Sequence, residues 1–290
     1  MTVLAATCTD ISQFELLKKA GADEAILALE NGCFSALETF AADAIIAASH
    51  EAHETGLTVT VLMNRLFSEE DIFSFTNQTE WLIDEGIDRI IVSDPGLLYA
   101  AKKKGLQDHL IFDPLTLITN APEAQLYKDL GLSSVTISQL LTKEEIMHIS
   151  SQVPGCSLCV FGHQLMSVSA RPLLSAYEKR KNLPSLINNR HLFLREEKRE
   201  DRMPAFENEY AAMIYSDYIL DSFDEIEAFE DAGIQRMEFH GEFLSEEILL
   251  DAVHTANRIL NKEPEAKDDF RNKYSGKPLT DGYYGIKTIK

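Results

Sequence analysis

This sequence contains no apolar run of about 18 residues, the length that a helix needs to cross a bilayer. Its first ten residues, Met-Thr-Val-Leu-Ala-Ala-Thr-Cys-Thr-Asp, also lack the basic segment with which a secretory signal begins. We therefore expect a cytoplasmic protein without a membrane partner.

Cysteine is scarce as well, and the four present are Cys8, Cys33, Cys156 and Cys159. They are too few and too irregularly spaced for a disulfide framework. Cys156 and Cys159 form a Cys-x-x-Cys, but the run around them is typical of a strand, where a separation of three turns side chains to opposite faces. The sequence predicts buried core thiols here rather than a metal site.

Several motifs of common enzymes are missing. Neither a Gly-x-Gly-x-x-Gly nor a Walker sequence is present, so the usual nucleotide-phosphate loops are excluded. There is no Gly-x-Ser-x-Gly elbow, and no cysteine accompanies a histidine in a known arrangement. The sequence therefore shows no familiar peptidase centre.

Basic residues are few, with 27 Lys and Arg against 47 Asp and Glu, a net charge of -20. Such a surface opposes nonspecific binding of nucleic acid. The bases are unevenly distributed, because residues 163–210 hold nine bases and seven acids and residues 262–290 hold seven and five. Either these are ordinary solvated loops, or the two segments together face an anionic ligand or partner.

Short β-branched runs alternate with amphipathic helices along the chain. Eight runs predict strands, at residues 3–6, 25–29, 58–63, 89–92, 110–112, 135–137, 158–161 and 236–239. Most are followed by a helix that ends at glycine, as in parallel sheets with crossover helices. The count favours an α/β fold, a TIM-like (β/α)8 barrel, with an open doubly wound sheet as the alternative.

The alternation stops once, after the seventh run. We predict a barrel over residues 1–260, an insertion at 163–218 and a C-terminal extension at 261–290. The insertion is rich in Arg, Asn and Ser but keeps interspersed apolar residues. We interpret it as a polar loop, folded at an active site or an interface, because long insertions in compact domains usually carry function.

In a barrel of this kind, function lies where strands end and the βα loops begin. His163 and His240 follow strands seven and eight, so they should be neighbours. Metal-ligand spacings are absent around them, so we expect no metal. The strand ends supply this ring of polar candidates: Thr7, Thr9, Glu30, Asn31, Asn64, Arg65, Asp94, Asp113, Ser138, Gln139, His163, Gln164, His240 and Glu242.

Arg171 lies in an apolar and serine-rich run, where a guanidinium needs an acceptor. It either pairs with Glu196 or Glu207, or binds a carboxylate or phosphate. No catalytic residue is assigned; His163, Arg171 and His240 are the candidates. The residues that we expect to bind a ligand are Asn64, Asp94, His163, Arg171, Ser175 and Glu196.

The stretch Phe161-Gly-His-Gln-Leu-Met-Ser-Val-Ser-Ala-Arg-Pro-Leu-Leu-Ser175 resembles the signature of the peptidase U32 family. That signature reads approximately His-Gly-x-x-Cys-x-Ser-x-Ser-Gly-Arg-Cys-Leu-Leu-Ser. Other landmarks agree in order along the chain, at residues 20–23, 34–36, 63–64, 87–94, 120, 194–196, 232–234 and 239–241. The resemblance implies a TIM-like fold and either peptidase activity or hydroxylation of uridine or cytidine in RNA, the tRNA branch being linked to prephenate.

Active members of the family are taken to carry an iron–sulfur cluster on cysteines, two of them in this signature. Here Leu165 and Pro172 occupy those positions, and neither can ligate iron. Charged family positions also change, to Leu37, Leu140, Glu238, His240 and Glu242.

The resemblance and these changes imply the non-cluster subunit of a tRNA 5-hydroxyuridine-forming system. Its partners would be a longer U32 paralogue and, through that complex, tRNA, with a homodimer left open. We expect no cofactor in this chain, an iron–sulfur cluster only in the partner, and a prephenate-related metabolite as a candidate ligand. The alternatives are a U32 peptidase, a hydrolase, and a small-molecule or anion-binding pseudoenzyme.

Overall fold

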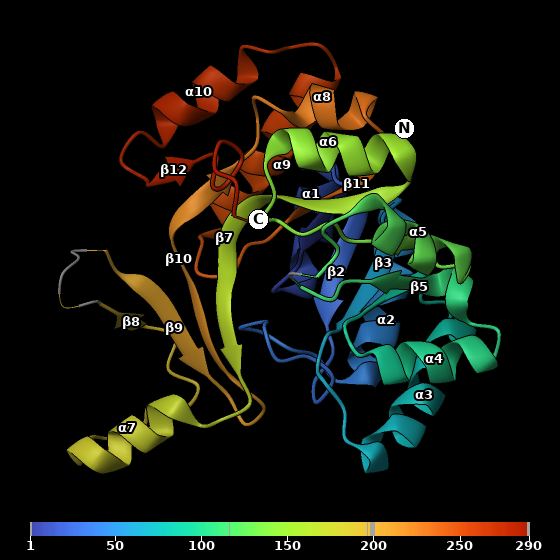
Figure 1. The fold of residues 1–290 in the computed structure, drawn as a ribbon, viewed down its shortest axis with the longest axis vertical. Coiled ribbons are helices and arrows are strands. Elements are labelled where there is room, and N and C mark those ends of the chain that lie inside the picture. The colour runs from blue at the N-terminus through green and yellow to red at the C-terminus, as the bar shows by residue number, and fades with distance from the viewer. Residues whose placement is uncertain (1, 116, 196, 198–200, 289–290) are drawn as a thin grey trace.

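A computed structural model describes residues 2–115, 117–195, 197 and 201–288. Eight strands form a (β/α)8 barrel, in the order β6-β5-β4-β3-β2-β1-β11-β7 (Figure 1). All neighbours in this series pair in parallel. The ring closes where Thr136, just after β6, bridges to Ser157 of β7. The predicted TIM-like barrel is confirmed.

The barrel strands are short and largely buried. They are β1 (Val3–Thr7), β2 (Glu24–Ala28), β3 (Thr58–Met63), β4 (Arg89–Val92), β5 (Leu110–Phe112), β6 (Ser134–Val135), β7 (Cys156–Ser169) and β11 (Ile234–Phe239). Aliphatic side chains of alternate residues meet inside the barrel, where Ala5, Ile26, Ile91 and Ile111 form a small buried cluster. Most of the core lies outside the barrel, between the strands and the helices.

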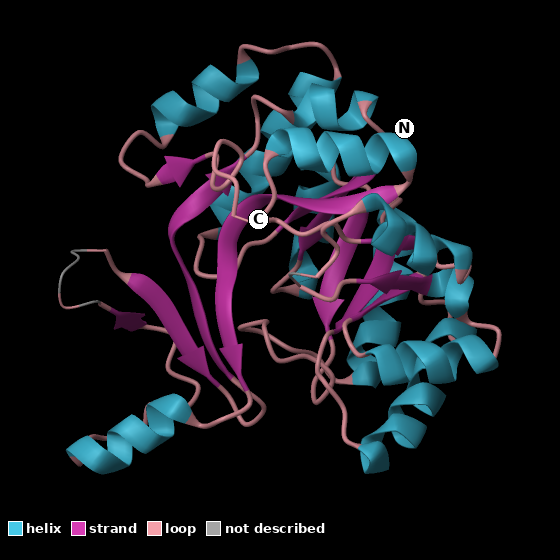
Figure 2. Ribbon diagram, in the orientation of Figure 1, coloured by secondary structure: helices cyan, strands magenta, loops and turns pink. Residues whose placement is uncertain are grey.

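The helices cover the outside of the barrel (Figure 2). They are η1 (Ile11–Gln13), α1 (Phe14–Ala20), α2 (Ala42–Thr55), α3 (Glu69–Asp84), α4 (Pro95–Lys103), η2 (Gln107–His109), α5 (Ala121–Asp129), α6 (Lys143–Gln152), α8 (Ile226–Asp231) and α9 (Glu246–Leu260). Side-chain caps fix several starts; Thr142 and Glu145, for example, form a reciprocal capping box at α6. Among the described residues, no helix is long and apolar enough to cross a membrane.

The expected polar loop after strand seven is wrong in its first part, because β7 continues to Ser169 instead of ending at Phe161. Its outer half pairs in antiparallel fashion with β10 (Ala212–Asp221), which in turn pairs with β9 (Met203–Glu207), and β9 with β8 (Leu192–Leu194). With α7 (Leu173–Lys181) at its end, this sheet extends beyond the barrel mouth (Figure 1). We call residues 164–215 the arm.

The C-terminal segment packs back onto the barrel. In α10 (Ala266–Lys273), the ring of Phe270 contacts Phe161 and Phe223 edge to face. The short β12 (Leu279–Thr280) pairs with β10. Tyr284 is buried and its hydroxyl lies 2.7 Å from the Ser222 hydroxyl. The tail therefore holds the base of the arm against the barrel.

Candidate functional site

A cavity of about 80 Å³ lies at the carboxyl ends of the barrel strands. Its floor is aliphatic, with Ile26, Leu62 and Ile91. Its walls are polar: Thr7, Ser35, Asn64, Asp113, Thr136, Gln139, Cys159, His163, Tyr215, Glu238, His240 and Glu242. This is the end of a (β/α)8 barrel at which enzymes of this fold place their chemistry.

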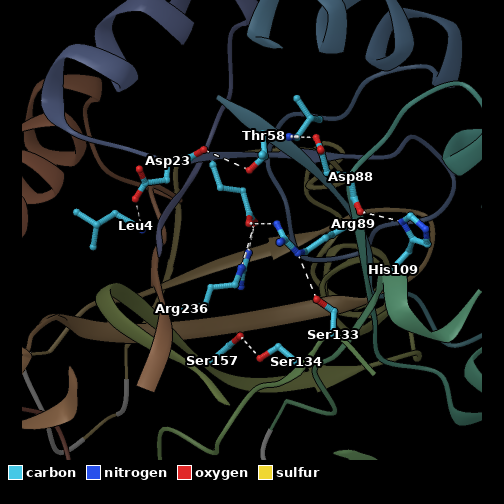
Figure 3. A network of polar contacts seen from close by, with 12 residues as sticks. Leu4, Asp23, Thr58, Asp88, Arg89, His109, Ser133, Ser134, Ser157 and Arg236 are labelled. Atoms are coloured by element: carbon cyan, nitrogen blue, oxygen red, sulfur yellow. Dashed lines mark hydrogen bonds and ion pairs between the residues drawn. The ribbon is translucent and has the colours of Figure 1, made fainter. Parts of the chain in front are cut away.

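Charged side chains fill the barrel interior next to the cavity. Arg236 of β11 donates to Glu24 of β2 from Nε and Nη2, at 3.1 and 2.5 Å, and also donates to Glu238. Arg89 of β4 contacts the other oxygen of Glu24 at 3.4 Å and donates to Ser133 (Figure 3). Glu24, Arg236 and Glu238 are all buried, so each charge is balanced inside the barrel.

Glu238 connects this interior network to the cavity. Its second carboxylate oxygen lies 3.0 Å from Nε2 of His240. Burial alone would raise the pKa of Glu238, but Arg236 and His240 lower it to about 2. Burial likewise opposes protonation of His240, yet Cys159 and Glu238 together hold its pKa well above the usual value. The cavity wall therefore carries a fixed carboxylate and an imidazolium side by side.

Asp113 follows β5, and its pKa is raised, whereas that of Glu238 is lowered. Desolvation, with the nearby Glu238 charge, raises the pKa of Asp113 to about 6. Its Oδ1 accepts a hydrogen bond from the backbone of Leu115 at 2.8 Å, which partly offsets that rise. Asp113 thus has a raised pKa and Glu238 a lowered one. In enzymes, such a difference lets one carboxyl act as an acid while the other stays ionised.

His163 lies on β7 and His240 directly follows the adjacent strand β11, so the two are neighbours, as expected, and both line the cavity. Nδ1 of His163 lies 2.8 Å from the carbonyl oxygen of Ser216 on β10. Burial lowers the pKa of His163, which favours the neutral ring. The two histidines therefore present different protonation states to one small space.

The arm supplies one wall of the cavity. The hydroxyl of Tyr215, on β10, donates to the backbone oxygen of Ser35 at 2.6 Å. Asn64, at the end of β3, accepts from the backbone of Phe34 at 3.2 Å and donates to the Ser35 hydroxyl at 2.8 Å. Asn64 thus lines the cavity while holding the loop after β2.

A larger groove of about 540 Å³ separates the arm from the barrel mouth. It shares His163 and Glu242 with the cavity. Three Lys and Arg side chains line it, Arg190 and Arg202 from the insertion and Lys277 from the tail. Acids also line it, among them Glu38, which pairs with Arg190. The insertion and the tail therefore face a common space.

The other predicted ligand-binding residues lie away from the cavity. Asp94 caps α4, accepting from the backbones of Leu97 and Phe67 at 2.9 and 3.0 Å. Arg171 is exposed near the tip of the arm. Ser175 donates through its backbone at 2.9 Å, and through its hydroxyl, to the buried Glu207. Glu196 lies outside the described residues, so the expectation of one shared pocket holds only for Asn64 and His163.

Sequence reasoning missed three groups of the cavity. Cys159 is a buried thiol, as expected, but it lines the cavity rather than only the outer core. Tyr215 reaches the cavity through a strand pairing that no local pattern indicates. For Glu238 the sequence indicates only a changed family position, although a buried run that reads Arg-Met-Glu-Phe-His-Gly-Glu is itself a sign of an internal charge network.

The donor set does not fit an iron–sulfur cluster at the signature positions. Leu165 lines the cavity with an aliphatic side chain, and Pro172 is exposed just before α7. Within the described ranges, no group of three or more His, Cys, Asp or Glu side chains is arranged to hold a metal ion. No step of the chemistry is therefore assigned to such a group in this chain.

Comparisons with solved structures agree with the barrel. The U32 peptidase Mk0906 superposes with a TM-score of 0.52 at 15% identity, over 83% of this chain and 92% of that one. Phosphoribosyl anthranilate isomerase from Thermus thermophilus superposes with a TM-score of 0.50 at 9% identity, over 90% and 100% of the two chains. At such identities the likeness shows the fold alone.

Among curated proteins, tRNA hydroxylation protein P2 of Bacillus subtilis is 23% identical over 239 residues, or 81% of this chain and 77% of that protein. tRNA hydroxylation protein P of Haemophilus influenzae is 30% identical over 129 residues, which are 44% of this chain and 28% of that protein. A model of Peptidase family U32 matches residues 9–287, nearly the whole chain. The protein belongs to peptidase family U32.

Proposed function

We propose that this chain is a cytoplasmic, non-cluster subunit that supports 5-hydroxylation of uridine in tRNA, together with a longer U32 paralogue. The observation that carries the proposal is its similarity, along most of both chains, to a protein named for tRNA hydroxylation. The match to protein P covers only 28% of that longer protein, so the two relatives differ in what they have beyond the shared part.

The residues at the signature positions favour a subunit that contributes no redox centre of its own. Hydroxylation of a pyrimidine carbon is an oxidation, which needs a redox-active group. Leu165 and Pro172 offer no thiolate to such a group. In this proposal the redox centre belongs to the paralogue, and the chain described here contributes binding and positioning.

The outer part of the arm is suited to RNA. Residues 166–195, which we call the basic segment, contain six Lys and Arg and one acid, in a chain of net charge -20. Lys179, Arg180 and Lys181 are exposed in the last turn of α7. Two aromatic side chains, Tyr177 and Phe193, are 52% and 55% exposed in the same segment. Bases with interleaved aromatic rings are the combination that contacts phosphates and stacks on unpaired bases.

Co-purification tests the partnership. The chain is tagged at its chromosomal locus in its native cell, and material that binds is analysed by mass spectrometry after nuclease treatment and without it. The proposal expects the longer U32 paralogue in stoichiometric amount in both samples. Recovery of the chain alone, or only of copies of itself as a homodimer, would rule the heteromeric subunit out.

A second candidate, a small-molecule binding protein, is favoured by one observation, the groove with basic side chains from both insertion and tail. A small dicarboxylate such as prephenate suits Arg190, Arg202 and Lys277. At a ligand concentration about 100 times Kd, binding stabilises a protein by about 2.7 kcal/mol. Thermal unfolding with and without prephenate therefore tests it, and an unchanged Tm at millimolar ligand rejects it.

A further inference from the structure

Three reactive groups meet at the cavity without any role in the proposed function. Cys159 on β7 and Glu238 on β11 are direct partners in the parallel register. His240, two residues after Glu238, lies 3.0 Å from its carboxylate. All three side chains line the same cavity. A thiol, an imidazole and a carboxylate are the components of a cysteine nucleophile with its base and orienting group.

The backbone here is irregular in a way that places these groups. The β7 register relative to β11 shifts by one residue, since Glu238 pairs with Cys159 and Phe239 with Phe161. Val160 is therefore the extra residue of a bulge, a device that re-aims side chains beside functional sites. Gly162 follows with φ 124°, and a Cβ there would lie 2.3 Å from the His240 carbonyl oxygen. At Gly162, β7 therefore lies too close to the end of β11 to accept a residue with a Cβ atom.

Charge supports the same arrangement. Glu238 is anchored by Arg236, which is itself held by Glu24, so the carboxylate beside His240 is fixed in position. Burial raises the pKa of the other thiols, to about 12 for Cys8 and about 11 for Cys33 and Cys156. Cys159 differs from those three in lining the same cavity as an imidazole, that of His240.

We propose that Cys159 is a nucleophilic thiol activated by His240, and that the cavity takes a small uncharged carbonyl compound. Glu238 acts as a positioning residue, because it holds the imidazole rather than touching the ligand. The inference is independent of tRNA modification and stands whether or not the chain has a partner.

The bond changes balance without an oxidant or a leaving group. The Cys159 proton resides on His240, and the sulfur forms a bond to the carbonyl carbon. The π pair of the carbonyl moves to its oxygen, which takes the proton from His240. The product is a hemithioacetal, and the reverse sequence releases the ligand.

Cavity size and charge define the ligand class. A volume of about 80 Å³ favours a small compound. Asp113, Glu238 and Glu242 line the same space and repel anions. The titratable groups that surround the thiol and the imidazole come from several elements: Asp113 after β5, His163 on β7, Arg236 and Glu238 on β11, Glu242 after it, and Tyr284 of the tail.

Alkylation of the intact protein by iodoacetamide, followed by peptide mass spectrometry, tests the proposal for each cysteine separately. Cys159 should be labelled first, with Cys8, Cys33 and Cys156 as internal controls. A thiol with an ordinary pKa of about 8.5 reacts roughly fiftyfold more slowly at pH 6.5 than at pH 8.5. For Cys159 the decrease should be less than about tenfold, because in the proposed pair the thiol proton resides on His240.

Variants separate activation from exposure. His240→Asn should give Cys159 the ordinary pH profile, and Glu238→Gln should shift it in the same direction, whereas the exposed His254→Asn should leave it unchanged. Iodoacetate, the anionic analogue, should label Cys159 more slowly than iodoacetamide. Labelling of Cys159 no faster than the three controls, or an ordinary pH profile in the unsubstituted protein, overturns the proposal even if a variant fails to fold. Equal labelling by iodoacetate overturns the uncharged ligand class.

Discussion

Arg236 of β11 donates two hydrogen bonds to one oxygen of Glu24 on β2, at 3.1 and 2.5 Å, across the interior of the barrel. β1 lies between these two strands, so the ion pair connects the beginning of the barrel with its last strand. Both side chains are buried, and the same guanidinium also holds Glu238 at the cavity. The charge network is therefore part of the scaffold and of the site at once.

The first prediction concerns this guanidinium. Arg236→Met leaves Glu24 and Glu238 buried without their shared cation, which should lower the free energy of unfolding by about 3–5 kcal/mol. Urea denaturation at pH 7 measures it. Arg258→Met, which removes a half-buried surface arginine that pairs with the exposed Glu263 and Asp269, is the matched control and should have little effect. Equal losses in the two variants would contradict the structural role of the network.

A second prediction follows from Asp113. Its pKa of about 6 lies above that of an unfolded aspartate, so the native state keeps the proton longer and stability from this group decreases as pH rises from about 4 to 6. Asp113→Asn keeps the oxygen that accepts from Leu115 and should stabilise the protein by roughly 1–2 kcal/mol at pH 7, and little at pH 4. Denaturation at both pH values measures this. As a control, Asp108→Asn, at an exposed aspartate, should leave the free energy of unfolding unchanged at both pH values. If Asp113→Asn stabilises the protein as much at pH 4 as at pH 7, titration of Asp113 is not the cause.

The third prediction concerns Gly162. Because its φ is 124° and a Cβ would meet the His240 backbone, Gly162→Ala should cost about 2–4 kcal/mol. Gly276→Ala, where a Cβ meets nothing within 4 Å, should change stability little. Thermal unfolding compares the two. If Gly162→Ala is as stable as Gly276→Ala, the close approach of β7 and β11 is wrong.

The fourth prediction concerns the basic segment. Replacing Lys179, Arg180 and Lys181 by Gln should weaken tRNA binding by the heteromeric complex about tenfold near 0.1 M salt, and reduce the slope of log affinity against log salt by about 2–3. Filter binding over a range of salt concentrations measures both. The same substitutions at 102–104, a lysine triplet at the end of α4, provide the control. An unchanged slope in the arm variant would exclude these bases as phosphate contacts.

Local periodicity predicts the barrel well. The bounds of β3, β4 and β5 coincide with the predicted ones, because each strand has a pattern that its own residues determine. The strand predicted at 25–29 ends at Ala28 in the structure, where Leu29 instead pairs with Phe40 in an isolated bridge. Such a contact depends on tertiary structure, and local propensity does not contain it.

The prediction is least accurate for the arm, where β7 continues to Ser169 instead of giving way to a loop. The sequence predicts a loop at residues 164–169 because their strand pairing is with β10, which begins more than 40 residues later in the sequence. Alternation places Cys156 and Cys159 on opposite faces of β7, but it does not show that the face of Cys159 lines a cavity shared with residues of β11. Both errors concern long-range pairing of β7, which also determines the shape of the cavity.

The amount of 5-hydroxyuridine-derived nucleosides in tRNA, measured by liquid chromatography and mass spectrometry, tests most directly whether this chain takes part in tRNA hydroxylation. Cells that lack this gene should lose a large part of that modification, and regain it from a plasmid copy only while the longer U32 paralogue is present. An unchanged level in the deletion strain, in cells where deletion of the paralogue does lower it, would contradict a role for this chain in tRNA hydroxylation.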